Sequence, residues 1–180
     1  QPQRFQRDQL RPRDMIAAHM LGVGANMAFR RTTLSRVGSF DTALDVGTPA
    51  GGAGDLDMFH RVLVAGMLVH YEPTAIVYHH HRREAETLQR QIAANGRGFG
   101  VYLLKIWQRQ SVPRYSLLRF AVGWIGVWLV ARLFVAALGL LNVPFSLVWA
   151  EVCGALDAPQ AYNATYANDR RVRSRYGSSV

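Results

Sequence analysis

The chain has 180 residues, a formal net charge of +9 and a single cysteine. This length suffices for one domain with a sizeable core, or for part of a larger domain. Because Cys153 has no partner, an internal disulfide and a thiolate zinc site are excluded, and any metal would depend on histidine and carboxylate ligands. Lys105 is the only lysine, and arginine favours phosphate and carboxylate groups, so the charge indicates nucleic acid, anionic lipid or phosphorylated small molecules as partners.

The N-terminal part is expected to contain a linker followed by a strand. The opening segment QPQRFQRDQLRPRD is polar and arginine-rich, without the apolar core or cleavage site of a signal peptide, so residues 1–18 are predicted to be a linker from an absent upstream part. Residues 19–31, HMLGVGANMAFRR, are predicted to form a short, largely buried strand entered through glycines.

A glycine-rich loop followed by a helix is the clearest local feature. Residues 47–54 contain too many glycines for regular structure. Apolar residues then recur at helical spacing, which predicts a helix over 55–65 with Gly66 as its C-cap.

The next segment alternates between apolar and polar residues. Residues 67–78 are therefore predicted to form two short strands divided by Pro73. A long amphipathic helix is predicted from about 83 to 108, weakened around the glycines of NGRGFG.

The composition changes after Pro113. Residues 111–160 contain the most apolar stretch of the chain and are expected to form membrane-associated helices, whereas the basic tail 161–180 is expected to be disordered. A membrane span needs about 20 apolar residues, and here Arg132 lies near the centre of the candidate segment 117–141, at a cost of about 2.5–3.5 kcal/mol.

Tryptophans accompany this arginine. Trp124, Trp128 and Arg132 share one helical face, which is typical of helices that lie in the membrane interface. We therefore favour interfacial helices over one clean span. A buried helical hairpin that docks on an absent partner domain is the alternative.

Two aspartates begin the helix that follows the glycine loop. A carboxylate at a helix N-terminus is often a plain N-cap, but glycines let a backbone and a ligand approach closely. A carboxylate that is held at this junction and faces a cleft could accept a proton from an attacking hydroxyl, and Asp55 is the candidate for this role. Asp57 is more consistent with a structural pair to Arg61 at i, i+4. Their Asp-x-Asp pattern is discounted as a metal motif because the two side chains diverge on a helix.

A histidine cluster ends the second predicted strand. On a strand, His79 and His81 share a face and His80 points away, so the first and third are candidate metal ligands, with Arg82 beside them for phosphate. The alternative is a polar strand end with solvated histidines.

Five segments carry a resemblance to a known family. They are GANMAFRR, VGSFDTAL, GTPAGGAGDLDMFHRVLVAG, YEPTAIVYHHHRRE and NGRGFGVYLLK. In this order and spacing, from Leu21 to Lys105, the chain resembles the C-terminal half of the catalytic domain of family 2 inverting glycosyltransferases. The resemblance implies an α/β architecture, a partial GT-A domain over 19–110 that lacks its N-terminal nucleotide-binding half.

The resemblance also implies site residues. The carboxylate at the junction of glycine loop and helix is the family's catalytic base and falls on Asp55, with Gly51, Gly52, Gly54 and Asp57 shaping the acceptor side. Many members have glutamate where this chain has Gly54. The family's His-x-His-Arg segment falls on His79, His81 and Arg82, and it implies a divalent metal, Mg²⁺ or Mn²⁺, that bridges the diphosphate of the donor. The Gln-x-x-Arg-Trp motif of processive synthases is not found.

The function implied is inverting transfer from a nucleotide-diphospho-sugar to a glycan or lipid-linked hydroxyl acceptor, at the cytoplasmic face of the cell membrane. The isolated chain is expected to be inactive. The first alternative is a non-catalytic module that anchors to anionic lipid. A nucleic-acid binder is the weakest alternative, because the aromatic residues lie in apolar runs rather than among the arginines.

Overall fold

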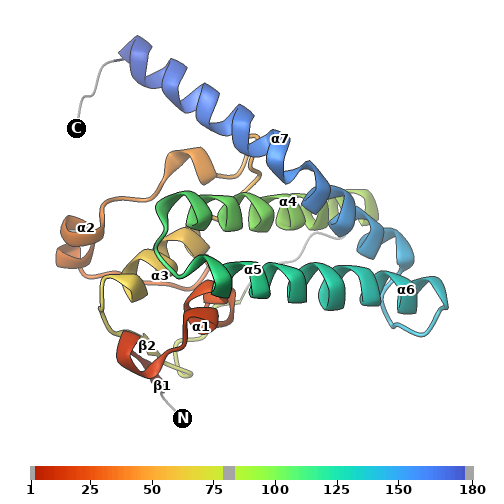
Figure 1. Cartoon of the computed structure of the whole chain (residues 1–180), viewed down its shortest axis with the longest axis horizontal. Coiled ribbons are helices and arrows are strands. Elements are labelled where there is room, and N and C mark those ends of the chain that lie inside the picture. The colour runs from red at the N-terminus through yellow and green to blue at the C-terminus, as the bar shows by residue number, and fades with distance from the viewer. Residues whose placement is uncertain (1–2, 79–83, 177–180) are drawn as a thin grey trace.

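The computed structural model describes residues 3–78 and 84–176, with side chains as far as residue 167. The elements, in chain order, are β1 (Gln3–Phe5), η1 (Arg7–Gln9), α1 (Pro12–Ile16), η2 (Ala18–Met20), α2 (Arg31–Val37), η3 (Thr42–Leu44), α3 (Gly54–Val64), β2 (Val69–Tyr71), α4 (Ala85–Arg109), α5 (Arg114–Gly123), the π-helical η4 (Trp124–Ala131), α6 (Arg132–Ala137) and α7 (Phe145–Tyr176). In Figure 1, α4 and α5 run side by side, α7 crosses α4, and the short N-terminal elements gather beside α3.

The predicted α/β, partial GT-A architecture is wrong. The structure is mostly helical, with 65% helix against 4% strand, and its sheet has only two strands. β1 and β2 pair antiparallel, with Phe5 opposite Val69 and Gln3 opposite Tyr71. A strand is stable when its backbone N–H and C=O groups find a neighbouring strand. Among the described residues, only this short pairing meets that need.

Most of the predicted strands are accordingly absent. In the segment 67–78 only β2 is a strand, and Ile76 and Tyr78 beyond it are 69% and 91% exposed. The segment 19–31, predicted to be a largely buried strand, is a 3₁₀ turn followed by a loop, with Met20 78% exposed. Alternation of apolar and polar residues predicts which side of a strand would be buried, but it does not provide the neighbouring strand with which the backbone must pair.

The predicted helix after the glycine loop is confirmed as α3. Gly66 has a φ of +73°, as expected for a residue that ends a helix in the left-handed region. α3 is amphipathic and presents Leu63 and Met58 to the interior, where both are fully buried.

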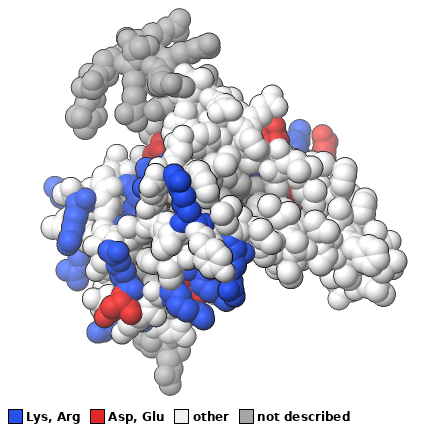
Figure 2. All heavy atoms as spheres, in the orientation of Figure 1, with Lys and Arg blue, Asp and Glu red and all other residues white. Residues whose placement is uncertain are grey.

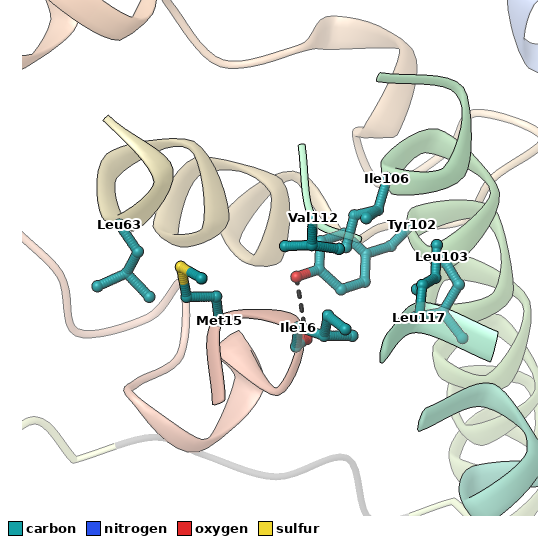
Figure 3. Packing of buried hydrophobic residues seen from close by; sticks show 8 residues of the cluster. All are labelled: Met15, Ile16, Leu63, Tyr102, Leu103, Ile106, Val112 and Leu117. Atoms are coloured by element: carbon teal, nitrogen blue, oxygen red, sulfur yellow. Dashed lines mark hydrogen bonds between the residues drawn. The ribbon is translucent and has the colours of Figure 1, made fainter. Parts of the chain in front are cut away.

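The main core joins segments that are distant in sequence. It contains Met15, Ile16, Leu63, Tyr102, Leu103, Ile106, Val112 and Leu117 (Figure 3). The hydroxyl of Tyr102 donates a 3.0 Å hydrogen bond to the carbonyl of Ile16, and burial raises the pKa of this phenol well above its ordinary value. Because Ile16 is fully buried, the segment 1–18, expected to be a linker, contributes to the core instead.

The glycines of NGRGFG do not weaken α4, which runs unbroken from Ala85 to Arg109. They permit close packing. A Cβ on Gly96 would lie 2.3 Å from the carbonyl oxygen of Glu151 in α7, and one on Gly100 would lie 2.4 Å from the Cβ of Ala158. Small residues at these positions therefore let α4 and α7 cross at a distance that larger side chains would prevent.

The apolar region forms one long helix. α5, η4 and α6 are continuous over Arg114–Ala137. The most apolar 18-residue window of this helix has a mean hydropathy of 1.9, and only 11% of that window is buried. Length and composition would allow this helix to cross a membrane, which is weak evidence by itself. The basic tail, expected to be disordered from residue 161, is helical as far as Tyr176, and Ala161 and Thr165 are buried.

Candidate functional site

Asp55 lies in the first turn of α3 with its carboxylate held from two sides. The backbone N–H of Gly24 donates to Oδ2 at 2.9 Å, and that of Leu56 donates to Oδ1 at 2.9 Å. The side chain is half-buried. Each carboxylate oxygen keeps a second lone pair, so the group is oriented by the backbone and still able to accept a proton.

The loop before α3 has the strained backbone that glycine favours. Gly51 and Gly52 have φ angles of +79° and +148°, and Ala53, the N-cap of α3, has a φ of +83° despite its side chain. A left-handed non-glycine residue at a helix start is uncommon and marks a position over-determined by its surroundings. α4 packs closely against this loop, because a Cβ on Gly98 would lie 3.3 Å from the backbone of Gly52, and it therefore contributes to the constraint.

A cavity of about 1050 Å³ opens beside Asp55. Its walls come from α1, the loop and first turn of α3, the middle of α4 and one face of α5 and η4. Gly52 lines it, as predicted for an acceptor-side loop residue, whereas Gly51 and Gly54 do not belong to its lining. Gly51 instead packs against Ala94, since a Cβ there would lie 3.1 Å from that side chain.

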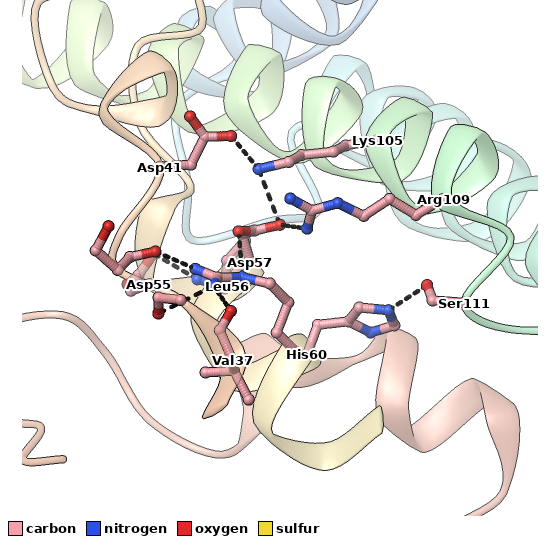
Figure 4. Close-up of polar contacts among 12 residues, drawn as sticks. Val37, Asp41, Asp55, Leu56, Asp57, His60, Lys105, Arg109 and Ser111 are labelled. Atoms are coloured by element: carbon pink, nitrogen blue, oxygen red, sulfur yellow. Dashed lines mark hydrogen bonds and ion pairs between the residues drawn. The ribbon is translucent and has the colours of Figure 1, made fainter. Parts of the chain in front are cut away.

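Asp57 has a different environment from Asp55. It is 2% exposed, and the predicted pair with Arg61 is present, with Nε 2.9 Å from Oδ2. Two cations from α4 complete its shell (Figure 4). Arg109 Nη1 lies 2.6 Å and Lys105 Nζ 3.1 Å from Oδ1. Surrounded by three cations and closed to solvent, Asp57 has a structural environment, and its role as an acceptor-loop residue stays a prediction.

This cluster links three parts of the chain. Lys105 also pairs with Asp41, at the cap of η3. Burial by itself raises the pKa of Asp41, but the ammonium of Lys105 outweighs it and holds that pKa below its ordinary value. Arg61 donates to the carbonyls of Val37, the last residue of α2, and of Ser39 just beyond it. The ion pairs therefore fasten the loops at 37–45 to α3 and α4.

His60, predicted to be an ordinary helix residue, is buried in a satisfied position. Its Nδ1 lies 3.0 Å from the carbonyl of Met15 and its Nε2 lies 2.7 Å from Ser111 Oγ. Burial lowers the pKa of this imidazole, which is therefore held neutral. In the described part of the chain, the hydrogen-bond partners of His60 lie outside the lining of the cavity beside Asp55.

The predicted metal and diphosphate ligands His79, His81 and Arg82, together with His80, lie outside the described residues. Among the side chains described, those of residues 3–78 and 84–167, no group of three or more from histidine, cysteine or the carboxylates is placed to hold a metal. The metal assignment therefore stays a prediction.

Sequence reasoning missed several residues around the site. Lys105 and Arg109 lie four residues apart on α4, and this spacing of two cations on one face could have indicated the buried anion between them. Arg119 and Glu151 line the cavity from α5 and α7, and only the tertiary packing brings them there.

Comparisons of the chain with known protein families, with curated proteins and with solved structures find no match. The functional assignment therefore depends on the residues and their geometry.

Proposed function

We propose that this chain is part of an enzyme that transfers a glycosyl group, with inversion, from a nucleotide-diphospho-sugar to a hydroxyl acceptor. The observation that carries the proposal is Asp55. Its half-buried carboxylate is fixed by two backbone N–H groups at the rim of the large cavity. The sequence resemblance of residues 21–105 to family 2 glycosyltransferases, which does not extend to the GT-A fold, assigns the same carboxylate as the base.

The reaction is a single displacement. The acceptor oxygen forms a bond to the anomeric carbon while the bond from that carbon to the diphosphate oxygen breaks, and Asp55 takes the acceptor proton. Inversion follows because attack and departure occur on opposite faces of the sugar ring. In this proposal the described residues around Asp55 form the acceptor side. Donor binding and a divalent metal at His79 and His81 belong to the proposal without a described geometry.

A substitution tests the base in the protein as its gene encodes it. Asp55→Asn should keep the fold and lower turnover by about 100-fold or more, because the amide cannot accept the proton. Turnover is measured as nucleoside diphosphate released from a panel of sugar nucleotides. The matched control is Asp45→Asn, since Asp45 is an exposed carboxylate of the neighbouring loop outside the cavity lining. Near-normal turnover in Asp55→Asn would remove this residue from the mechanism.

A second function is favoured by a separate observation. The helix over 114–137 exposes its apolar residues, and arginines lie at its start, as in a module that anchors to anionic lipid without chemistry. This alternative predicts membrane binding with no turnover of any sugar nucleotide. The two functions are compatible in one protein, and the turnover assay alone decides whether chemistry is present.

A further inference from the structure

The cavity beside Asp55 is elongated and chemically divided. It follows α5 and η4 from Tyr115 to Trp128, a rise of about 20 Å for a helix of this length. Near the start of α5 its wall is formed by α1, which packs against that helix. At the other end the wall is formed by Glu151 of α7. The apolar helix therefore lines the cavity along its whole length, with α1 beside one end and Glu151 beside the other.

The α1 end is basic. Arg11 and Arg13 both lie near the carboxylate of Asp14, and Arg119 has no ion-pair or hydrogen-bond partner within the described part of the chain. Figure 2 shows basic side chains gathered on the side of the molecule that holds α1 and α3, whereas the end around α6 carries none in this view. A guanidinium without a partner, in a cavity that Arg11 and Arg13 also line, is suited to a phosphate group.

The acidic side chains in the same lining do not cancel this preference. Asp14 is engaged by its two arginines. Glu151 accepts from Arg132 at 2.5 Å and from Trp128 Nε1 at 2.9 Å, so its charge is matched within the apolar helix. Asp55 is left facing the cavity, and Arg119 is left as a cation without a carboxylate partner.

Beyond Arg119 the wall of the cavity is aromatic and apolar. Phe99 of α4 lies 4.8 Å from Trp124 and 6.2 Å from Phe120 between ring centroids, so three rings form one wall. The neighbouring residues of the helix, such as Ile125 and Val127, are 50% and 73% exposed. The apolar wall of the cavity is thus continuous with the exposed apolar surface of the helix, and a hydrocarbon chain can follow it without crossing polar surface.

We propose that this cavity binds a phosphorylated lipid, with its phosphate at Arg119 and the α1 arginines and its hydrocarbon chain along Phe120 and Trp124. The bound lipid would be the acceptor, with the hydroxyl of its headgroup at Asp55, and this part of the inference rests on the proposed glycosyl transfer. The apolar wall and its continuity with the exposed helix favour a lipid over a free phosphate, because a hydrocarbon chain gains free energy by leaving water for this wall and a free anion has no apolar surface to bury there.

Binding is tested on the complete chain in nanodiscs of neutral phosphatidylcholine. The probe is bromododecyl phosphate with bromine at the end of the chain, which quenches the fluorescence of nearby tryptophans such as Trp124. Bromododecyl maltoside is the neutral control that partitions into the same bilayer. We expect quenching by bromododecyl phosphate to reach saturation. Quenching by bromododecyl maltoside should rise only in proportion to its concentration. Equimolar inorganic phosphate should not displace the bound bromododecyl phosphate.

Two variants locate the phosphate. Arg119→Gln should weaken binding about tenfold, since a charge-assisted hydrogen bond is lost. Arg36→Gln, which removes an exposed arginine of α2 outside the cavity, should leave binding unchanged. Both side chains are exposed, so neither change is expected to unfold the chain.

The outcomes are decisive in either direction. Equal binding by the parent chain and Arg119→Gln, or equal behaviour of the phosphate and maltoside probes, would overturn the proposal. Displacement by equimolar inorganic phosphate would overturn the lipid and leave a simple anion site. Because this measurement needs no sugar nucleotide, saturable lipid binding together with an enzyme that transfers no sugar would refute the proposed function while the lipid site stands.

Discussion

The close crossing of α4 and α7 predicts that replacing Gly154 by alanine destabilises the protein, although alanine in place of glycine normally stabilises a helix. Gly154 is buried on α7, and a Cβ built there would lie 1.9 Å from the carbonyl oxygen and 2.7 Å from the carbonyl carbon of Ala93. An ordinary carbon–oxygen contact is about 3.3 Å or longer. Because the obstacle is backbone, Gly154→Ala would have to separate the two helices by about 1.4 Å if they moved along the line of contact.

Two opposing terms set the magnitude. Overpacking of this kind costs about 1–3 kcal/mol, and the upper part of the range applies where backbone must move. Alanine in place of glycine in a helix stabilises the folded state by about 1 kcal/mol. The net effect of Gly154→Ala is therefore a loss of about 2 kcal/mol in the free energy of unfolding. For a chain of this size that corresponds to a Tm about 4–8 °C lower.

Gly126→Ala is the matched control. A Cβ on Gly126, in η4, meets nothing within 4 Å. Only the helix-propensity term remains, so this variant should keep or raise the Tm, by at most about 4 °C. Thermal unfolding followed by far-ultraviolet circular dichroism in one neutral detergent compares the two variants. An increase of Tm in Gly154→Ala similar to that in Gly126→Ala would refute the close packing of α4 on α7.

The remaining predictions concern the buried charges and the apolar helix. Asp57→Ala should lower the free energy of unfolding by about 3 kcal/mol, measured by urea denaturation, because Arg61 loses its carboxylate partner and the buried Lys105 keeps only Asp41; a loss below 1 kcal/mol would contradict the structural role. Since burial lowers the pKa of His60 below its ordinary value of 6.5, the unfolded chain takes up the proton first, so stability is complete above about pH 6.5 and falls below it. His60→Gln should remove that part of the pH dependence, and an unchanged pH profile would assign it to another group. Ile125→Asn together with Val127→Asn should abolish flotation with anionic liposomes, whereas Val46→Asn, at an 85% exposed valine outside the helix, should not; continued flotation of the double variant would exclude the middle of this helix as the membrane contact.

Some features of this protein follow from local sequence. The periodicity after the glycine loop correctly predicts α3, and the i, i+4 spacing correctly predicts the ion pair between Asp57 and Arg61. The position of Asp55 at a helix start follows in the same way. These features depend on residues within one or two helical turns, where the backbone geometry itself determines which side chains meet.

Other features depended on partners far away in the chain. The predicted strands over 19–31 and 67–78 needed neighbours to hydrogen-bond with, and the described structure supplies only the pairing of β1 with β2. The glycines of NGRGFG were predicted to weaken a helix, because their effect on propensity is local. Their packing against α7 and the loop at Gly52 is set by segments that no local pattern contains.

The candidate site shows the same division. Sequence alone selects Asp55 as a carboxylate between a glycine loop and a helix. Only the tertiary structure brings the backbone of Gly24 to its carboxylate, encloses Asp57 with two cations from α4, and places Arg119 along the same cavity. The physical reason is that helix periodicity orients side chains about one axis, whereas a cavity is formed by the relative placement of several axes, which is decided by long-range packing.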